Sequence, residues 1–413
     1  MAAFFYFVVV VVGVACFFQA SVVVSDDRFC GQGGDQVSYV RARGSEFVLD
    51  DRPLFINGFN AYWVTYYSFE LVTRPHVSSL FRDASALGLN VARVWAFNDG
   101  GYHALQATPG AYNEEAFQGL DFVIAEAQSY GLMLILSLSN NYNSYGGKPQ
   151  YAQWAREAGH SVESEDDFFK HSVIKGYYKD YVKAVLTRVN TITGVAYRDD
   201  PTIFAWELIN EPRCSSDPSG DTLQAWIEEM SAFVKSLDSN HMLEVGLEGF
   251  YCSSDLQRAG LGSWSSDLGT DFIRNNAIPS IDFATVHSYP DLWLPDEDFE
   301  VQLSFLVQWI QNHIEDAAVR LNKPVLFAEF GKSNRTRGFV VEQRDRFFAA
   351  TYETIFSSFP AAAAGGLLWQ LVTEEIGDAI DDGYQIVPSR NPSTVTVIST
   401  QSQRVSIMNS RRS

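Results

Sequence analysis

Short and almost continuously apolar runs recur along the chain at a nearly constant spacing. Successive runs begin 36 to 43 residues apart, with one longer step of 70, a period that suits one strand, one helix and two loops. Unbroken runs such as LMLILSL are typical of parallel strands whose outer face is covered by helices. The predicted strands are residues 54–60, 90–96, 132–138, 202–208, 242–247, 281–287, 324–330 and 365–370.

Eight such units without a long Pro, Gly or Ser linker predict an α/β fold, a single (β/α)₈ TIM barrel. A doubly wound sheet is the alternative. Residues 121–130 and 301–321 have the spacing of covering helices. The long step predicts an extended loop between strands three and four. Its aromatic residues suggest a wall for the substrate, although a decorative surface loop is the alternative: Tyr142, Tyr145, Tyr151 and Trp154.

The chain begins with a charge-free, largely apolar segment. Residues 1–25 have the length of a secretory signal but are short for a membrane span, so we expect a cleaved signal peptide followed by a single catalytic domain, residues 26–413. A buried N-terminal helix is the alternative. The expected location is secreted and extracellular, without membrane association after cleavage.

Charge argues against nucleic acid as a partner. Lys and Arg number 30 against 50 Asp and Glu, which gives a net charge of −20, whereas a phosphate-binding surface needs clustered cations. We expect a monomer. The sequence Asn334-Arg335-Thr336 is an acceptor site for an N-glycan on a secreted chain.

Cysteine use is sparse. Cys16 would leave with the signal, and three cysteines remain. Cys214 and Cys252 follow strands four and five, whose loops adjoin on one face of a barrel, so we expect them to form a disulfide with Cys30 as the free thiol.

Two carboxylates end apolar strands. Glu211 ends strand four in TIFAWELINEP, and Glu329 ends strand seven in PVLFAEFG. A single strand-end Glu usually caps a helix or pairs with Arg, but two facing each other across a barrel suit glycosidic bond cleavage, with one carboxyl protonated and the other ionised.

Other polar and aromatic residues at strand ends are expected to line the same cavity. Arg93 and Tyr289 would favour the ionised form of Glu329, and His287 would bond the sugar or the acid. Trp369, Trp95 and Trp154 are expected to stack on sugars, although core packing is the ordinary alternative for a lone barrel Trp. Glu207, inside strand four, is interpreted as structural and balanced by Arg93.

Motifs for other chemistries are absent from the sequence. It contains no H-E-x-x-H, G-x-S-x-G or Cys/His cluster, and no G-x-G-x-x-G follows a strand. We therefore expect neither a metal nor a cofactor.

The strings GFNAYW, ARVWAF, AWELINEPRC, VHSYPDLW, VLFAEFGKS and GGLLWQL resemble the plant endo-β-1,4-mannanases of glycoside hydrolase family 5. The likeness runs from about residue 47 to 394. It implies that Glu211 is the acid/base and Glu329 the nucleophile. It further implies five residues that support the sugar at the cleavage site: Arg93, Asn210, His287, Tyr289 and Trp369.

The resemblance implies a retaining endo-β-1,4-mannanase that cuts internal bonds in mannan, galactomannan and glucomannan of the plant cell wall. Residue spacing does not separate mannose from glucose, so an endo-β-1,4-glucanase on the same barrel is one alternative. A catalytically inactive polysaccharide-binding barrel is the other, and it would be expected to have lost one of the two acids.

Overall fold

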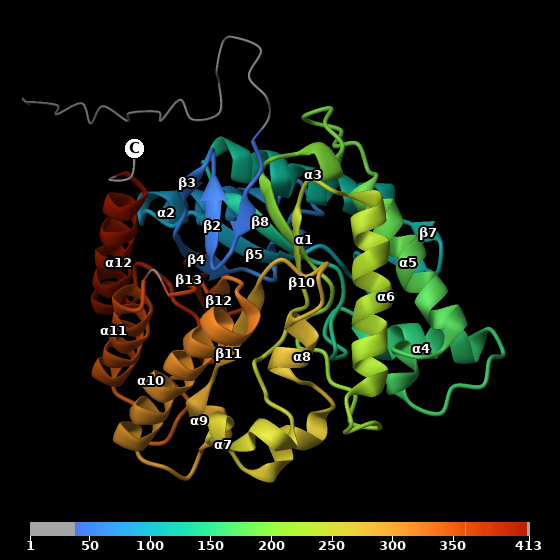
Figure 1. The fold of residues 1–413 in the computed structure, drawn as a ribbon. Coiled ribbons are helices and arrows are strands. Elements are labelled where there is room, and N and C mark those ends of the chain that lie inside the picture. The colour runs from blue at the N-terminus through green and yellow to red at the C-terminus, as the bar shows by residue number, and fades with distance from the viewer. Residues whose placement is uncertain (1–37, 360, 411–413) are drawn as a thin grey trace, which may run out of the picture. The chain divides into compact units, whose positions relative to one another are not determined.

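The centre of the molecule is an eight-stranded parallel sheet that curls into a nearly closed barrel (Figure 1). The computed structural model describes residues 38–359 and 361–410. The strands neighbour one another in the order β10-β9-β8-β5-β4-β13-β12-β11. Their bounds are β4 Ile56–Asn60, β5 Val91–Trp95, β8 Met133–Ser137, β9 Ile203–Glu207, β10 Met242–Glu244, β11 Ala284–Ser288, β12 Val325–Phe330 and β13 Ala363–Leu368.

All eight predicted strands are confirmed, and the barrel is confirmed over the doubly wound sheet. The largest shifts are three residues: the fifth strand ends at Glu244 rather than at residue 247, and the sixth begins at Ala284 rather than at residue 281. Strands β10 and β11 stand at the two ends of this order. The gap between them is closed by isolated hydrogen bonds instead of a continuous ladder. The Asp282 amide donates to the Leu243 carbonyl at 2.8 Å, and the His287 amide donates to the Glu248 carbonyl at 2.9 Å.

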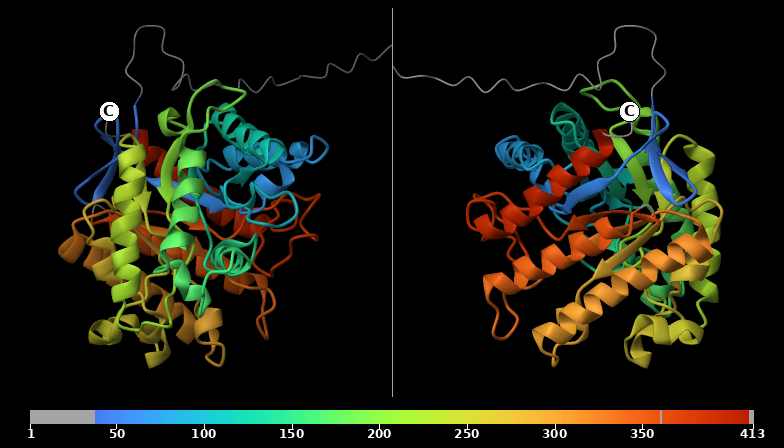
Figure 2. Two further views of the ribbon diagram at one scale, coloured as in Figure 1. Left: turned by 90° about the vertical axis from the view of Figure 1, so that its right-hand side faces the viewer. Right: turned by 60° about the vertical axis from the view of Figure 1, so that its left-hand side comes forward.

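Helices surround the barrel, and α10, α11 and α12 lie side by side along one flank (Figure 2). The α-helices are α1 Val64–Tyr67, α2 Arg74–Ala86, α3 Glu114–Ser129, α4 Gly147–Glu157, α5 Ser172–Leu186, α6 Asp221–Leu237, α7 Leu256–Ala259, α8 Phe272–Asn276, α9 Pro290–Trp293, α10 Phe299–Asp316, α11 Val341–Ser357 and α12 Pro392–Ser410. The 3₁₀ helices are η1 Glu165–Phe168, η2 Tyr197–Asp199, η3 Ser253–Asp255 and η4 Ser263–Leu268, and η5 Ala317–Leu321 is π-helical.

Both predicted covering helices are present, as α3 and as α10 continued by η5. Each begins at a side chain that caps free backbone N–H groups. Asn113 accepts from the amides of Glu115 and Ala116, and Asp298 accepts from the amide of Val301. The caps explain why both helices begin earlier than their apolar spacing alone indicates.

The predicted extended loop between strands three and four is not confirmed, because the segment contains helix α4. Tyr151, Trp154 and Ala155 have helical spacing and form its buried face. The Tyr151 and Trp154 rings contact each other, with centroids 5.2 Å apart, inside the hydrophobic core. Trp154 is therefore packed in the core, and its stacking on a sugar in the cleft stays a prediction.

A small antiparallel sheet contributes to the core inside the barrel. It consists of β1 Arg41–Arg43, β2 Glu46–Leu49 and β3 Arg52–Pro53. Phe47 on β2 is buried, and its ring packs edge-on against Phe204 and Phe283 at 5.0 and 5.1 Å. These rings belong to a cluster of side chains from β4, β5, β8, β9, β10, β12 and β13.

We expect Phe47→Ala to lower the free energy of unfolding by about 3 to 5 kcal/mol, because it removes a fully buried ring and leaves a cavity. Chemical denaturation would measure the loss. Phe47→Leu, which retains more of the volume, should cost clearly less. Equal losses for the two variants would contradict this packing account.

The predicted disulfide between Cys214 and Cys252 is not formed. Both cysteines are free, and their Sγ atoms lie near different hydroxyls, those of Ser216 at 3.7 Å and Ser254 at 3.1 Å. Neighbouring loops are not sufficient, because a disulfide also requires Cβ vectors that point toward each other. Cys30 lies outside the described residues.

The predicted signal peptide also lies outside the described residues. Within residues 38–359 and 361–410, none of the helices combines the length and apolar character that crossing a membrane requires.

Candidate active site

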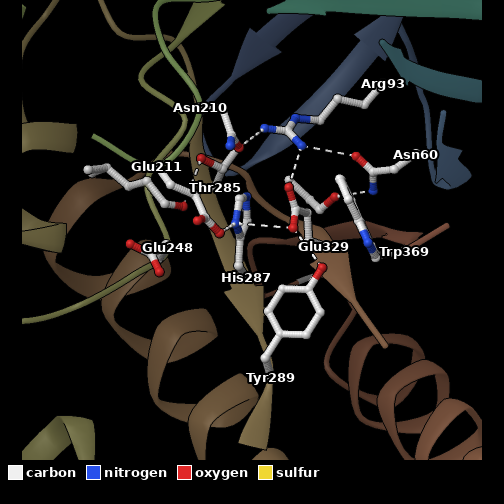
Figure 3. A network of polar contacts seen from close by, with 12 residues as sticks. Asn60, Arg93, Asn210, Glu211, Glu248, Thr285, His287, Tyr289, Glu329 and Trp369 are labelled. Carbon is white, nitrogen blue, oxygen red and sulfur yellow. Dashed lines mark hydrogen bonds and ion pairs between the residues drawn. The ribbon is translucent and has the colours of Figure 1, made fainter. Parts of the chain in front are cut away.

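Arg93 on β5 is the centre of a buried polar network (Figure 3). Its guanidinium donates twice to Glu207, with distances of 2.6 and 2.8 Å. It also donates to Glu329 Oε1 at 2.6 Å, to Asn210 Oδ1 at 2.7 Å and to Asn60 Oδ1 at 3.0 Å. The interpretation of Glu207 as a structural partner of Arg93 is confirmed. The planar guanidinium fixes groups from β4, β9 and β12 relative to one another.

Glu329 is the next-to-last residue of β12 and is buried between two donors. In addition to Arg93, the Tyr289 hydroxyl donates to Glu329 Oε2 at 2.7 Å. A carboxylate that accepts a charge-assisted bond on one oxygen and a phenol on the other is held in one orientation. This arrangement is suited to attack by an ionised carboxylate.

Glu211 follows β9 in a left-handed backbone conformation, with φ of +52°. This conformation is unfavourable for a residue with a side chain, so it persists only where the surroundings hold it. The Glu211 amide donates to the Gly246 carbonyl at 2.8 Å. Gly246 must be glycine, because a Cβ there would meet the Ile209 carbonyl oxygen at 2.0 Å. The backbone of two strands thus sets the direction of this acid.

His287 on β11 lies between the two acids (Figure 3). Its Nδ1 is 2.6 Å from Glu211 Oε1 and 3.6 Å from Glu329 Oε2. One oxygen of Glu211, one nitrogen of His287 and one oxygen of Glu329 all lie within 4.8 Å of one another. The two carboxyls therefore face one small space.

Burial raises the pKa of both acids above the ordinary value of a glutamic acid. At Glu329 the charges of His287 and Arg93 and the Tyr289 hydrogen bond oppose this rise. At Glu211 the opposing groups are Arg213, Arg93 and the Tyr142 hydroxyl. As expected, Arg93 and Tyr289 favour the ionised form of Glu329 and lower its pKa. Burial has the larger effect, so the pKa is raised overall.

Three further polar residues at this end of the barrel were not found from the sequence: Glu248, Arg213 and Asn60. Glu248, after β10, accepts two hydrogen bonds from Arg213 at 2.8 and 2.6 Å. Burial and the nearby Glu211 charge raise the pKa of Glu248 to about 7. Asn60 is the third, and it donates to the carbonyls of Ala328 and Leu368 as well as accepting from Arg93. All three follow or end barrel strands, which is the signal that could have found them.

Aromatic side chains gather beside the acids. Trp369, which follows β13, is partly exposed and stacks on Tyr62, with centroids 5.5 Å apart and planes 10° apart. Its indole N–H donates to Asp382 at 2.7 Å. Trp95 is buried, and its ring contacts those of Tyr62 and Tyr145, with centroids 5.0 and 5.4 Å apart. The predicted stacking of Trp95 on a sugar stays a prediction.

Glu211, His287 and Glu329 also have a spacing that could hold a cation. The Arg93 guanidinium, 2.6 Å from Glu329, already provides a positive charge there, and Tyr289 donates to the other oxygen of the same carboxylate. These contacts favour acid and nucleophile chemistry over metal binding.

We expect Tyr142→Phe to shift the alkaline limb of the pH profile of kcat/KM to higher pH. An acid catalyst works while protonated and loses activity as pH rises through its pKa. The Tyr142 hydrogen bond favours the ionised Glu211 and lowers its pKa, so removing the hydroxyl should raise that pKa. The profile would be measured on a mannan oligosaccharide, whose leaving group needs the proton of the acid. Tyr145→Phe is the matched control, and an equal shift in both variants would contradict this assignment.

Comparisons with known proteins show which family this chain resembles along most of its length. A family model described as GH family 5 beta-mannosidase-like matches residues 37–372. Mannan endo-1,4-beta-mannosidase 7 of Arabidopsis thaliana is 54% identical over 90% of this chain and 86% of its own length. Mannan endo-1,4-beta-mannosidase 1 of Oryza sativa subsp. japonica is 54% identical over 91% and 87%.

A solved structure extends the agreement to the fold. The endo-1,4-beta-mannanase of Rhizomucor miehei superposes with a TM-score of 0.75 at 31% identity, covering 90% of this chain and 100% of that one. The endo-beta-1,4-mannanase of Thermotoga petrophila gives 0.75 at 30% identity, covering 87% and 78%. The chain therefore belongs to glycoside hydrolase family 5, among its β-mannosidase-like members.

Proposed function

We propose that this protein is a secreted endo-β-1,4-mannanase that hydrolyses internal bonds of mannan, galactomannan and glucomannan in the plant cell wall with retention of configuration. The observation that carries the proposal is the approach of one oxygen of each strand-end carboxyl to within 4.8 Å of the other. Retaining glycosidases hold their carboxyls about 5 to 5.5 Å apart, whereas inverting enzymes need about 6.5 to 9.5 Å to admit a water.

Glu329 is the proposed nucleophile. Its oxygen forms a bond to the anomeric carbon while the glycosidic bond breaks, and Glu211 transfers its proton to the departing oxygen. Arg93 and Tyr289 hold the attacking carboxylate and stabilise its charge before attack. Formation of the glycosyl ester removes that charge, which lowers the pKa of Glu211 and allows it to act as base.

Water completes the second step. Glu211 accepts its proton as the water oxygen attacks the anomeric carbon, and the bond to Glu329 breaks. Two displacements at one carbon return the β configuration. Asn210, linked to Arg93 at 2.7 Å, and Trp369 are proposed to contact the reacting sugar, the latter as the apolar surface under its ring.

The choice of mannan rests on the named relatives. A direct test compares release of reducing sugar from pure mannan with release from a soluble cellulose derivative. Hydrolysis of mannan alone is the expected result. Hydrolysis of the cellulose derivative alone would support the glucanase alternative, and no hydrolysis of either would support the binding barrel.

Secretion is part of the same proposal. It is supported by the apolar segment of residues 1–25 and by the exposed position of Asn334, the acceptor of the predicted N-glycan. N-terminal sequencing of protein from the medium of expressing plant cells should begin near residue 26. Protein that stays in the cell with Met1 intact would overturn this part.

A further inference from the structure

Two fully buried acids lie side by side beneath the active site. Glu207 on β9 and Glu244 on β10 are directly paired in the register of these parallel strands, so their side chains lie on the same face. Both are 0% exposed. The two carboxyls are also within hydrogen-bonding reach of each other.

Their partners differ. Glu207 accepts two bonds from the Arg93 guanidinium. Glu244 Oε2 accepts from the Gly246 amide and, at 3.1 Å, from the Thr285 hydroxyl, both neutral groups. Among the described residues, none donates to Glu244 Oε1, although this oxygen is buried.

The charges around the pair leave Glu244 without a cation of its own. The groups facing it are Glu207 from β9, Arg93 from β5 and the uncharged Thr285 from β11, with Glu329 from β12 beyond Arg93. Arg93 already contacts two carboxylates, Glu207 and Glu329. A third ionised carboxylate in this water-free interior would be strongly unfavourable, and a buried acid in that situation takes up a proton.

We propose that Glu244 is a positioning residue that remains protonated at neutral pH and donates a hydrogen bond to Glu207, which fixes Arg93 against the nucleophile Glu329. The neutral acid orients Glu207 without competing for the Arg93 charge. Arg93 can then present one N–H to Glu329 and another to Asn210. This inference rests on the proposed nucleophile, because it assigns Glu244 an effect on the step that Glu329 performs.

Three variants test the inference in the full-length enzyme. Glu244→Leu removes the donor, and kcat on mannan should fall about 10- to 100-fold with little change in KM, because misplacing a catalytic group affects the chemical step. Glu244→Gln keeps a donor of the same shape and should restore kcat to within about threefold of wild type, with an unchanged pH profile. Glu207→Gln is the matched control, and it should lower kcat at least as much as Glu244→Leu because Arg93 loses its anion.

The asymmetry between the two Gln variants is decisive. If Glu207→Gln were tolerated and Glu244→Gln were not, the proton would reside on Glu207 and the inference would be overturned. If Glu244→Leu kept full kcat, Glu244 would have no positioning effect.

A spectroscopic measurement is independent of activity. Infrared difference spectra at pH 7 should show that Glu244→Gln loses the carbonyl stretching band of one protonated carboxyl, whereas Glu207→Gln keeps it. Retention of that band in Glu244→Gln would overturn the inference. If the wild type failed to hydrolyse mannan, the proposed function would be contradicted. The infrared spectra would still show which of the two acids carries the proton.

Discussion

Glu329→Ala is expected to lower kcat on mannan by about 10⁴- to 10⁶-fold, because it removes the group that forms the covalent intermediate. Folding should be retained, since Arg93 keeps both bonds to Glu207 and those to Asn60 and Asn210. Steady-state kinetics and thermal unfolding would be measured together. A variant that unfolds, or one that keeps substantial activity, would contradict the assignment.

The matched variant Glu211→Ala should differ in kind. With an activated aryl β-mannoside the leaving group needs no proton, so Glu329 should still form the intermediate. Because Glu211 no longer activates a water, azide should attack the anomeric carbon of the glycosyl-enzyme in its place and give a β-mannosyl azide. Glu329→Ala should give the α-azide or no product. Identical azide products from both variants would mean that the two acids do not have separate functions.

Arg93→Ala is the second change with a large expected effect. It leaves Glu207 and Glu329 buried without their shared cation, and breaking a buried ion pair in this way costs about 3 to 5 kcal/mol. The kcat should fall as well, because Glu329 loses the donor at 2.6 Å. Arg93→Lys should rescue little, since an ammonium cannot reproduce bonds to Glu207, Glu329, Asn60 and Asn210 in one plane.

The pH dependence of this loss has a definite sign. Without Arg93, the pKa values of the buried acids rise above those in the unfolded chain, so the folded variant binds more protons. Its stability should then decrease as pH rises from about 4 toward neutrality, relative to wild type. Denaturation at several pH values would measure this trend. Arg346→Ala, at an exposed pair with Glu300, is the control and should not show it.

Much of this fold could be predicted from the chain because each buried strand is a short apolar run between polar loops. The two acids could be predicted because a strand such as PVLFAEFG has one acid near its end. Asn60 and Glu248 follow the same rule at the first and fifth strands. The sequence does not single them out, because a strand end by itself does not show that its side chain will contact Arg93 or Arg213.

Helix α4 is harder to predict from the sequence. Gly146, Gly147 and Pro149 are residue types typical of a loop, but a proline is compatible with the first turn of a helix, where its missing N–H has no partner to lose. The spacing of Tyr151, Trp154 and Ala155 was the better signal. The disulfide could not be predicted from adjoining loops alone, because the position of a loop does not determine where a Cβ points.

The electrostatics of the site depend on distances that a sequence does not contain. Arg93, Tyr289 and His287 could be named as partners of the acids. The effect of burial, which raises the pKa of both Glu211 and Glu329, follows only from their surroundings in the barrel. The distinction between the two acids therefore rests on their partners: Arg93 and Tyr289 at Glu329, and His287 and Tyr142 at Glu211.

The stereochemistry of the first product tests the central claim most directly. Proton NMR during early hydrolysis of a mannan oligosaccharide records the anomeric signals before they equilibrate in water. The approach of the two carboxyls to within 4.8 Å predicts that the β anomer appears first and the α anomer grows in later. Initial appearance of the α anomer would contradict the two-step mechanism and the assignment of Glu329 as the nucleophile.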